Sequence, residues 1–335
     1  MLHSLRKFRR IVGRLRRREQ PFILMYHRVA SLACDPWQLA IRPRNFDAQI
    51  EALVHVRQVV PLCWLARELV NGRTPYGTAA VTFDDGYADV LVEAMPVLER
   101  YGCPATMFLT TGAIGSVENF WWDELSHLLL ESTVLPPALE IEIGGRMYGW
   151  PFEKSPTDTV AKAGTAEAYA REALHLALWK ALRPLAPAAR RRHLDTLARW
   201  AGSDLQPRLA DRAMTAEDVR RLSEPGFIDI GAHSVTHPTM PSLDPAAREA
   251  ELVESKRACE QLTGVPADGF AYPFGDHDDA CIAAVRKAGF AFACSTKHAM
   301  LTKCSDTMRL PRLAVGDLEA EPFVNWLTRG MRAHG

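Results

Sequence analysis

Two adjacent carboxylates, Asp84 and Asp85, directly follow an apolar run over residues 79–83 and precede Gly86. The run is typical of a buried strand, and glycine permits a sharp backbone turn after it. Neighbouring strand residues point to opposite faces, so both carboxylates reach one centre only if the strand has already ended. Two close carboxylates repel each other without a cation, which predicts either a metal site or a separate acid and base. The structural alternative is a turn in which one aspartate caps the next helix.

Two histidines, His233 and His237, lie four residues apart just after a predicted strand over residues 227–232. On a helical turn this spacing brings two imidazoles to one face, about 5–6 Å apart. Two neutral imidazoles and one carboxylate form a three-ligand site that leaves positions open for water, which suits zinc-assisted hydrolysis. The spacing also arises by chance, so a polar surface role is the alternative.

Strands and helices alternate around these residues. Strands are predicted over residues 22–27, 59–62, 79–83, 105–110, 227–232, 270–272 and 290–295, and helices over 45–56, 65–70, 91–101, 244–262 and 278–287. Thr215 and Asp218 predict a capping box at the start of a further helix. The alternation predicts a parallel sheet, and the carboxyl ends of such strands meet at one face of a barrel. We therefore expect His27, Asp84, Asp85, the histidine pair and Tyr272 to converge.

The alternation lapses over about residues 116–213. Residues 139–150 predict a hairpin on Gly144-Gly145, and residues 165–182 and 187–201 predict two helices separated by prolines. We interpret this block as an insertion into an α/β fold that otherwise spans residues 21–335.

Composition excludes several classes of protein. The 335 residues are 47% hydrophobic and 24% charged, as in soluble globular proteins, and no apolar run predicts a transmembrane helix. Seven cysteines without a C-x-x-C pair argue against a disulfide framework and favour a reducing, cytoplasmic compartment.

The charge is distributed unevenly. Residues 1–19 carry eight basic and one acidic side chain, while the other 316 residues carry 32 basic and 39 acidic ones, which argues against nucleic-acid binding by the body. The segment lacks the apolar core of a signal peptide. Its apolar residues have helical spacing. We therefore expect residues 1–20 to form either a basic amphipathic helix or a solvated arm. The helix would contact anionic lipid at the inner face of the membrane through residues 1–18.

Three ordered segments together resemble the leading motifs of the polysaccharide deacetylases, the NodB-type enzymes of carbohydrate esterase family four. They are Thr82-Phe-Asp-Asp-Gly86, His233-Ser-Val-Thr-His237-Pro238 and Phe270-Ala-Tyr-Pro-Phe-Gly275. The resemblance covers about residues 22–330 and includes Met25-Tyr-His-Arg-Val29 and Phe120-Trp-Trp-Asp-Glu-Leu125. It implies a distorted parallel (β/α) barrel, commonly of seven strands, here with the hairpin and helices as its insertion.

The resemblance also implies roles for single residues. Asp84 would be the general base, and Asp85, His233 and His237 would hold a divalent metal ion, with Zn²⁺ as the expected ion. Tyr272 would offer its backbone N–H to the oxyanion. The chemistry agrees, because a metal lowers the pKa of bound water and a nearby carboxylate can take the proton.

The sequence departs from the family pattern in two places. Many members have an arginine at the position of Ala271, where it orients the base. The closing Leu-x-His motif, whose histidine protonates the leaving amine, has no clear match, because the last strand region has the sequence Arg309-Leu-Pro-Arg-Leu313. His27 is the first candidate for the acid, followed by His298 and His277, with a structural role as the alternative for each.

Three further residues are candidates for contact with the substrate, namely Trp121, Trp122 and Arg312. The two indoles could stack on sugar rings, and core or lid packing is the alternative.

We therefore expect a metal-dependent hydrolase that removes N-acetyl groups from amino sugars of a polysaccharide or glycan precursor. The alternatives are an O-acetyl esterase or deformylase that uses the same site, and an inactive carbohydrate-binding scaffold.

Overall fold

The computed structural model describes residues 19–132, 134–151, 166–224 and 226–330. The chain divides into two compact units. The first contains residues up to 32, 37–115 and those from 213 onward, and the second contains residues 33–36 and 116–212. The prediction for the basic N-terminal segment falls on residues 1–18, outside the described residues.

The first unit is built on a curled parallel sheet, and the predicted distorted (β/α) barrel is confirmed. Seven strands follow one another in the order β11-β10-β9-β6-β5-β1-β12, with β4 (Gln58–Val59) paired beside β5. The seven are β1 (Phe22–Tyr26), β5 (Thr78–Phe83), β6 (Ala105–Leu109), β9 (Ile228–Ala232), β10 (Gly269–Ala271), β11 (Phe292–Cys294) and β12 (Leu313–Ala314). An isolated parallel bridge joins Cys294 to Leu310 near the open side of the barrel.

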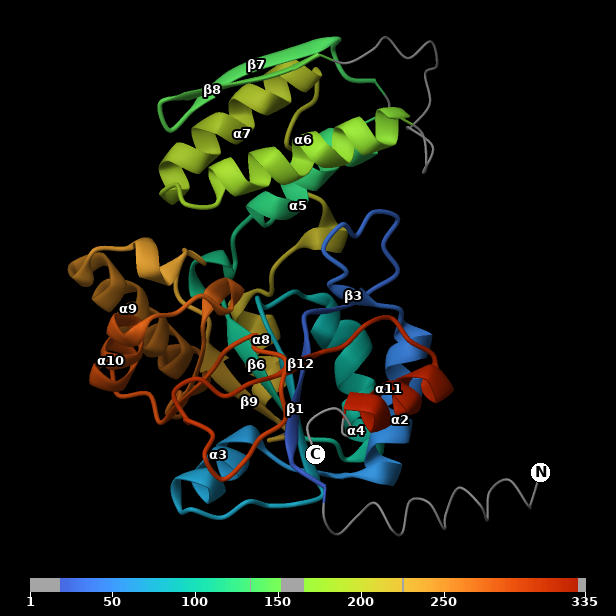
Figure 1. Cartoon of the computed structure of the whole chain (residues 1–335), viewed down its shortest axis with the longest axis vertical. Helices are drawn as coiled ribbons and strands as arrows, with labels where there is room; N and C mark the ends of the chain where they lie inside the picture. Colours follow the sequence, from blue (N-terminus) through green and yellow to red (C-terminus); the bar gives the residue numbers. More distant parts are fainter. Residues whose placement is uncertain (1–18, 133, 152–165, 225, 331–335) are drawn as a thin grey trace. The chain divides into compact units, whose positions relative to one another are not determined.

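Helices pack around the outside of this sheet. Figure 1 shows α2 (Pro43–Val56), α4 (Met95–Tyr101) and α11 (Ala320–Gly330) grouped along one flank and α9 (Pro245–Thr263) and α10 (Asp279–Lys287) along another. The predicted capping box is present at the start of α8 (Ala216–Ser223), where Thr215 and Asp218 bond reciprocally. The long predicted helix α9 ends at Gly264, whose φ of 74° is the left-handed conformation that suits a helix end.

Two predicted elements differ in detail. The helix predicted over residues 91–101 begins as a π-helical turn, Val90–Ala94, before α4. Pro96 explains the difference, because proline has no N–H to donate and disturbs the regular hydrogen-bond ladder of the preceding turn. The strand predicted over residues 59–62 is shorter, because Pro61 lies at the start of α3 (Leu62–Val70) and the chain is already helical from Leu62.

Side chains that alternate along the strands form two cores. Phe22, Leu24 and Tyr26 of β1 belong to the larger core, which the outer helices share. Ile23 belongs instead to the smaller core on the concave side of the sheet, together with Ala80 and Phe108 and the apolar side of α3. The series of side chains on the concave side continues, at the strand ends, into the candidate functional site.

The second unit contains the elements predicted for residues 116–213. Strands β7 (Ala138–Ile143) and β8 (Arg146–Pro151) form an antiparallel hairpin. Gly144 and Gly145 both have positive φ, as a tight two-residue turn requires. Helices α5 (Trp121–Ser126), α6 (Ala166–Leu182) and α7 (Pro187–Ala201) also belong to the described part of this unit. That this unit is an insertion stays a prediction.

None of the helices in the described part of the chain has the length and apolar character needed to span a membrane.

Candidate active site

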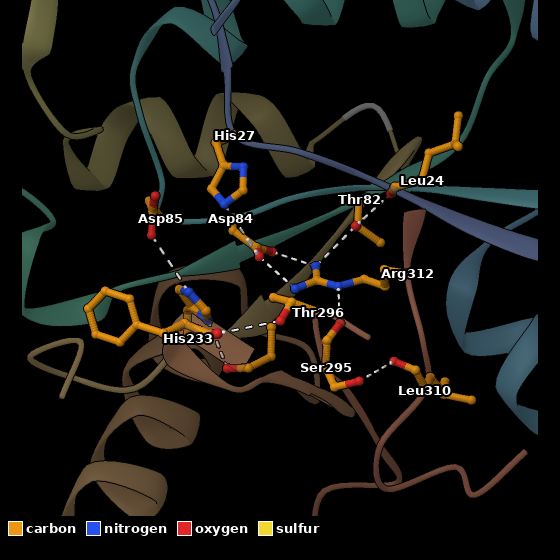
Figure 2. A network of polar contacts seen from close by, with 12 residues as sticks. Leu24, His27, Thr82, Asp84, Asp85, His233, Ser295, Thr296, Leu310 and Arg312 are labelled. Atoms are coloured by element: carbon orange, nitrogen blue, oxygen red, sulfur yellow. Dashed lines mark hydrogen bonds and ion pairs between the residues drawn. The ribbon is translucent and has the colours of Figure 1, made fainter. Parts of the chain in front are cut away.

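Along each strand every second side chain points to the concave side of the sheet. This alternation places polar side chains at the carboxyl ends of the strands. His27 continues the series Ile23 and Met25, and Asp84 continues Ala80 and Thr82. His233 follows β9 in the same phase as Gly231, and Arg312 precedes β12. Figure 2 shows His27, Asp84, Asp85, His233 and Arg312 pointing toward one another. The predicted convergence is therefore present for His27, Asp84, Asp85 and His233, which are far apart in sequence.

Asp84 and Asp85 reach the same centre because β5 has ended at Phe83. Asp85 has φ of 73°, a left-handed conformation that is uncommon outside glycine, and Gly86 follows with φ of 97°. This turn carries the Asp85 carboxylate back toward the histidines. Gly86 is needed here because its φ is hardly accessible to other residues.

Asp85, His233 and His237 form a buried group with the composition of a metal site. Asp85 Oδ1 lies 3.6 Å from His233 Nε2 and 3.5 Å from His237 Nε2, and the two Nε2 atoms are 3.1 Å apart. One ligand atom from each residue lies within 4.8 Å of the others. Burial lowers the pKa of His233, which favours the neutral imidazole that a metal requires. The donor set of two imidazoles and one carboxylate fits a divalent ion such as zinc.

The route by which His237 reaches this group differs from the prediction. The segment between the two histidines is a loop with bends rather than a helical turn. Ser234 and His237 have φ of 66° and 54°, both in the left-handed region. The His237 N–H donates to Ser234 Oγ at 3.0 Å, which closes the loop. His233 Nδ1 lies 2.8 Å from the Ala271 carbonyl oxygen, so this nitrogen carries the proton and Nε2 is free to bind a cation.

The position of Arg312 differs from the expectation that this residue contacts the substrate. Its guanidinium is fully buried and donates from Nη1 to Asp84 Oδ1 at 2.7 Å and from Nη2 to Oδ2 at 2.6 Å (Figure 2). Further bonds run to Thr82 Oγ1 and to the Ser295 carbonyl oxygen. A side chain with 0% exposure cannot reach a substrate. The expectation that Arg312 binds substrate is therefore wrong, and the structure assigns it to the positioning of Asp84.

The pair with Arg312 sets the charge of Asp84. Burial by itself raises the pKa of this carboxyl, but the charge and hydrogen bonds of Arg312, with smaller contributions from His233 and His27, lower it to about 2. Asp84 is thus a carboxylate at neutral pH. Each of its oxygens accepts one bond from Arg312 and retains a second acceptor position for another donor.

His27 is the candidate acid that contacts Asp84. Its Nε2 lies 4.0 Å from Asp84 Oδ2, and its side chain is 20% exposed. Burial lowers its pKa to about 4, so the imidazole is neutral near pH 7. The other two candidates pack elsewhere: His298 contacts the Trp326 ring, and His277 stacks on Tyr272 with Nδ1 beside the Gly275 carbonyl oxygen.

Tyr272 does not have the role that was expected of it. Its backbone N–H donates to the Cys294 carbonyl oxygen at 3.0 Å, as part of the pairing between neighbouring strands. Its hydroxyl donates to the Met308 carbonyl oxygen. The prediction that this N–H binds the oxyanion is contradicted, because strand pairing already uses the donor.

Trp121 and Trp122 are both buried within the second unit. Trp122 stacks on Phe120 with ring centroids 4.7 Å apart, and Trp121 packs on Trp122 and Trp179. Arg190 covers the Trp121 ring at 4.7 Å. This arrangement is that of core packing, the alternative stated above, and it exposes little ring surface to a sugar.

Two features of the site were missed in the sequence. Phe274 has φ of 58°, and its ring lies 4.4 Å from that of His237, in the loop after β10. Glu251 on α9 accepts hydrogen bonds from the loop between the histidines. Phenylalanine and glutamate do not by their type suggest such contacts. Adjacent residues of a helix lie on neighbouring parts of its surface, so Glu251 lies next to the buried Leu252 on α9.

Comparisons with known proteins agree with the motifs. A family model described as polysaccharide deacetylase matches residues 71–132 and 197–293. A Bacillus subtilis protein named as a polysaccharide deacetylase, YxkH, is 29% identical over 108 residues, which are 32% of this chain and 37% of that protein. The match thus spans little more than a third of that relative's length.

Two solved structures share the fold over nearly the whole chain. The Streptococcus pyogenes deacetylase PplD in complex with acetate superposes with a TM-score of 0.58 at 16% identity, covering 93% of this chain and 98% of that one. IcaB from Ammonifex degensii gives the same TM-score and identity, with 94% and 98% covered. At such identities the likeness concerns the fold. The ordered motifs, the family model and the fold agree with one another, and each makes this chain similar to the polysaccharide deacetylases.

Proposed function

We propose that this chain is a metal-dependent hydrolase that removes N-acetyl groups from amino sugars of a polysaccharide or glycan precursor. The observation that carries the proposal is a buried Asp85, His233 and His237 group directly beside an ionised Asp84. The match to the polysaccharide deacetylase family model supports the deacetylation chemistry, and the donor set supports zinc as the ion. A divalent ion held there would act as a Lewis acid toward the acyl oxygen and lower the pKa of a water molecule.

Asp84 would be the general base. Its carboxylate is ionised at neutral pH and held at both oxygens by Arg312, so it faces the site in one orientation. It would accept the proton of the attacking water as the new C–O bond forms. A positioned base of this kind contributes roughly 10²–10⁴-fold to the rate.

His27 would deliver a proton to the leaving nitrogen. Its Nε2 is 4.0 Å from Asp84 Oδ2, close enough for a proton taken by Asp84 to pass to it through a small shift or one water. Because burial keeps the free imidazole neutral, His27 must gain this proton during the reaction before it can donate it. The amine leaves as the C–N bond breaks, and acetate is the other product.

The cellular side of the proposal concerns the N-terminal segment. A basic segment beside a slightly acidic body supports a cytoplasmic enzyme that works on a precursor at the inner face of the membrane. The substrate would then be an N-acetylated, lipid-linked or soluble glycan precursor.

The test combines metal analysis with mass spectrometry of N-acetylated oligosaccharides. We expect about one divalent ion per chain, and products lighter by one or more acetyl groups. Asp84→Asn should keep the ion and lose turnover, whereas His233→Ala should lose the ion.

Each alternative gives its own result. Release of acetyl groups from O-acetylated but not from N-acetylated sugars would indicate an esterase, and release of formyl groups alone would indicate a deformylase. Oligosaccharide binding without turnover in the metal-loaded protein would indicate a binding scaffold. Any of the three would overturn the proposal.

A further inference from the structure

We propose that Glu251 on α9 is a positioning residue for the metal ligands, because it holds the loop that joins His233 to His237. The inference rests on the proposed function of the Asp85, His233 and His237 group. The Glu251 carboxylate stabilises the loop over residues 234–236 and thereby determines how tightly the site binds its ion.

One carboxylate satisfies three donors of this loop. Glu251 Oε2 accepts from the backbone N–H of Val235 at 2.7 Å and from that of Thr236 at 2.9 Å. Glu251 Oε1 accepts from Thr236 Oγ1 at 2.5 Å. Hydrogen bonds to a charged acceptor are stronger than neutral ones, so the three contacts form a firm attachment of the loop to α9.

The loop needs such an attachment because its backbone is unusual. Ser234 and His237 both have left-handed φ without being glycine, a conformation that persists only when the surroundings enforce it. His237 comes directly after the residues that Glu251 holds. A relaxed loop would therefore move the His237 imidazole away from Asp85 and His233.

The opposite side of the loop is held by the segment after β6. The N–H groups of Thr111 and Gly112 donate to the carbonyl oxygens of Ser234 and Val235, at 3.0 and 2.9 Å. A Cβ at position 112 would lie 2.6 Å from the Val235 carbonyl oxygen, so only glycine lets the two backbones approach. The carbonyl groups of the loop thus face Gly112, and its N–H groups face Glu251.

The test measures metal affinity rather than deacetylation. Zinc binding to the full chain is followed by competition with a chromophoric chelator, and the Co²⁺ form is examined by its visible absorption spectrum. Glu251→Ala should bind zinc about 10–100-fold more weakly, which is the usual effect of removing a group that orients metal ligands. Its Co²⁺ spectrum should change, since the ligand geometry changes.

Two further variants separate positioning from general stability. Glu251→Gln should keep most of the affinity, because its amide oxygen can accept the two N–H groups and its NH₂ can donate to Thr236 Oγ1. Glu254→Ala is the matched control on the same helix, where the side chain is exposed, and it should bind zinc as the wild type does. If Glu251→Ala does not fold, Thr236→Val removes one of the three contacts at constant shape and should weaken binding to a smaller degree.

The outcomes separate this inference from the proposed function. If the wild-type chain binds no divalent ion, the proposed function itself fails. If the wild type binds zinc, and Glu251→Ala or, failing that, Thr236→Val has wild-type affinity and an unaltered Co²⁺ spectrum, only the role of Glu251 is overturned.

Discussion

Arg312 makes the contact with Asp84 that the family resemblance assigns to an arginine at another position, on another strand. In this chain Ala271 stands at that other position, and its carbonyl oxygen orients His233 instead. Arg312 approaches Asp84 from the segment before β12 and binds both carboxylate oxygens. A guanidinium matches a carboxylate in this two-fold manner, which lysine does not do. The same electrostatic function is thus supplied from a different part of the sequence.

Removing this guanidinium should change the pH dependence of the reaction. Burial raises the pKa of Asp84 and Arg312 opposes it, so in Arg312→Gln the pKa rises from about 2. Asp84 is then protonated at higher pH, and the acidic limb of the kcat/KM profile should move upward. Arg312→Lys should give an intermediate profile because it keeps the charge without the two-fold contact. An unmoved acidic limb in Arg312→Gln would mean that Asp84 is not the base.

The same pair contributes to stability in a defined pH range. The folded-state pKa of Asp84 lies below its ordinary value of 3.8, so the contribution is present above about pH 3.8 and is lost as the pH falls toward 2. In Arg312→Gln a buried carboxylate has lost its partner, which typically costs about 3–5 kcal/mol near neutral pH. Urea unfolding of both proteins at pH 7 measures this difference.

His27 should matter only where the leaving group needs a proton. We expect His27→Gln to lower the hydrolysis of an N-acetyl amide by roughly 10²–10⁴-fold. An acetyl ester of an acidic phenol leaves without protonation, so its hydrolysis should change little in the same variant. Asp84→Asn is the control that should impair both reactions. Equal losses on both substrates in His27→Gln would assign His27 to another step.

Among the strands and helices, the features that follow from strand periodicity and from the order of the motifs were predictable from the sequence. The alternation of strands and helices predicts a parallel barrel, and the ends of β1, β5 and β9 place His27, Asp84 and His233 together. The partner of Asp84 was not predictable, because Arg312 lies 228 residues away and its contact depends on how far the barrel curls. Tyr272 was assigned wrongly because a motif does not show which N–H groups the sheet already uses.

The floor of the barrel depends on two glycines that face its interior. A Cβ at Gly231 would lie 2.6 Å from the Phe108 ring and 2.9 Å from the Gly269 carbonyl oxygen. Gly231→Ala should therefore lower the free energy of unfolding by about 1–3 kcal/mol through overpacking. Gly149→Ala is the control, since Gly149 is exposed in hairpin β7–β8 and its nearest such neighbour is 3.9 Å away. Both are measured by urea unfolding, and equal midpoints would contradict the packing argument.

Over the whole chain, the residues of the candidate site are separate from the basic residues that would determine where the protein is located. The catalytic candidates all belong to the first unit, while eight basic side chains gather in residues 1–19. A basic residue near an anionic membrane contributes about 1 kcal/mol. Such an attraction would act on the position of the protein and leave the chemistry proposed for Asp84 unchanged. The two contributions can therefore be tested independently.

Vesicle co-sedimentation of the full chain against a version that begins at Glu19 tests the location. This version removes all eight basic residues of the segment and keeps the ion pair between Glu19 and Arg57. The full chain should sediment with anionic vesicles at low salt and less at high salt, because the Debye length falls from about 30 Å at 0.01 M to about 3 Å at 1 M. The shorter version should stay in solution and deacetylate a soluble oligosaccharide at the same rate. Equal sedimentation of both versions would leave the segment as a solvated arm, with the proposed deacetylase chemistry unaffected.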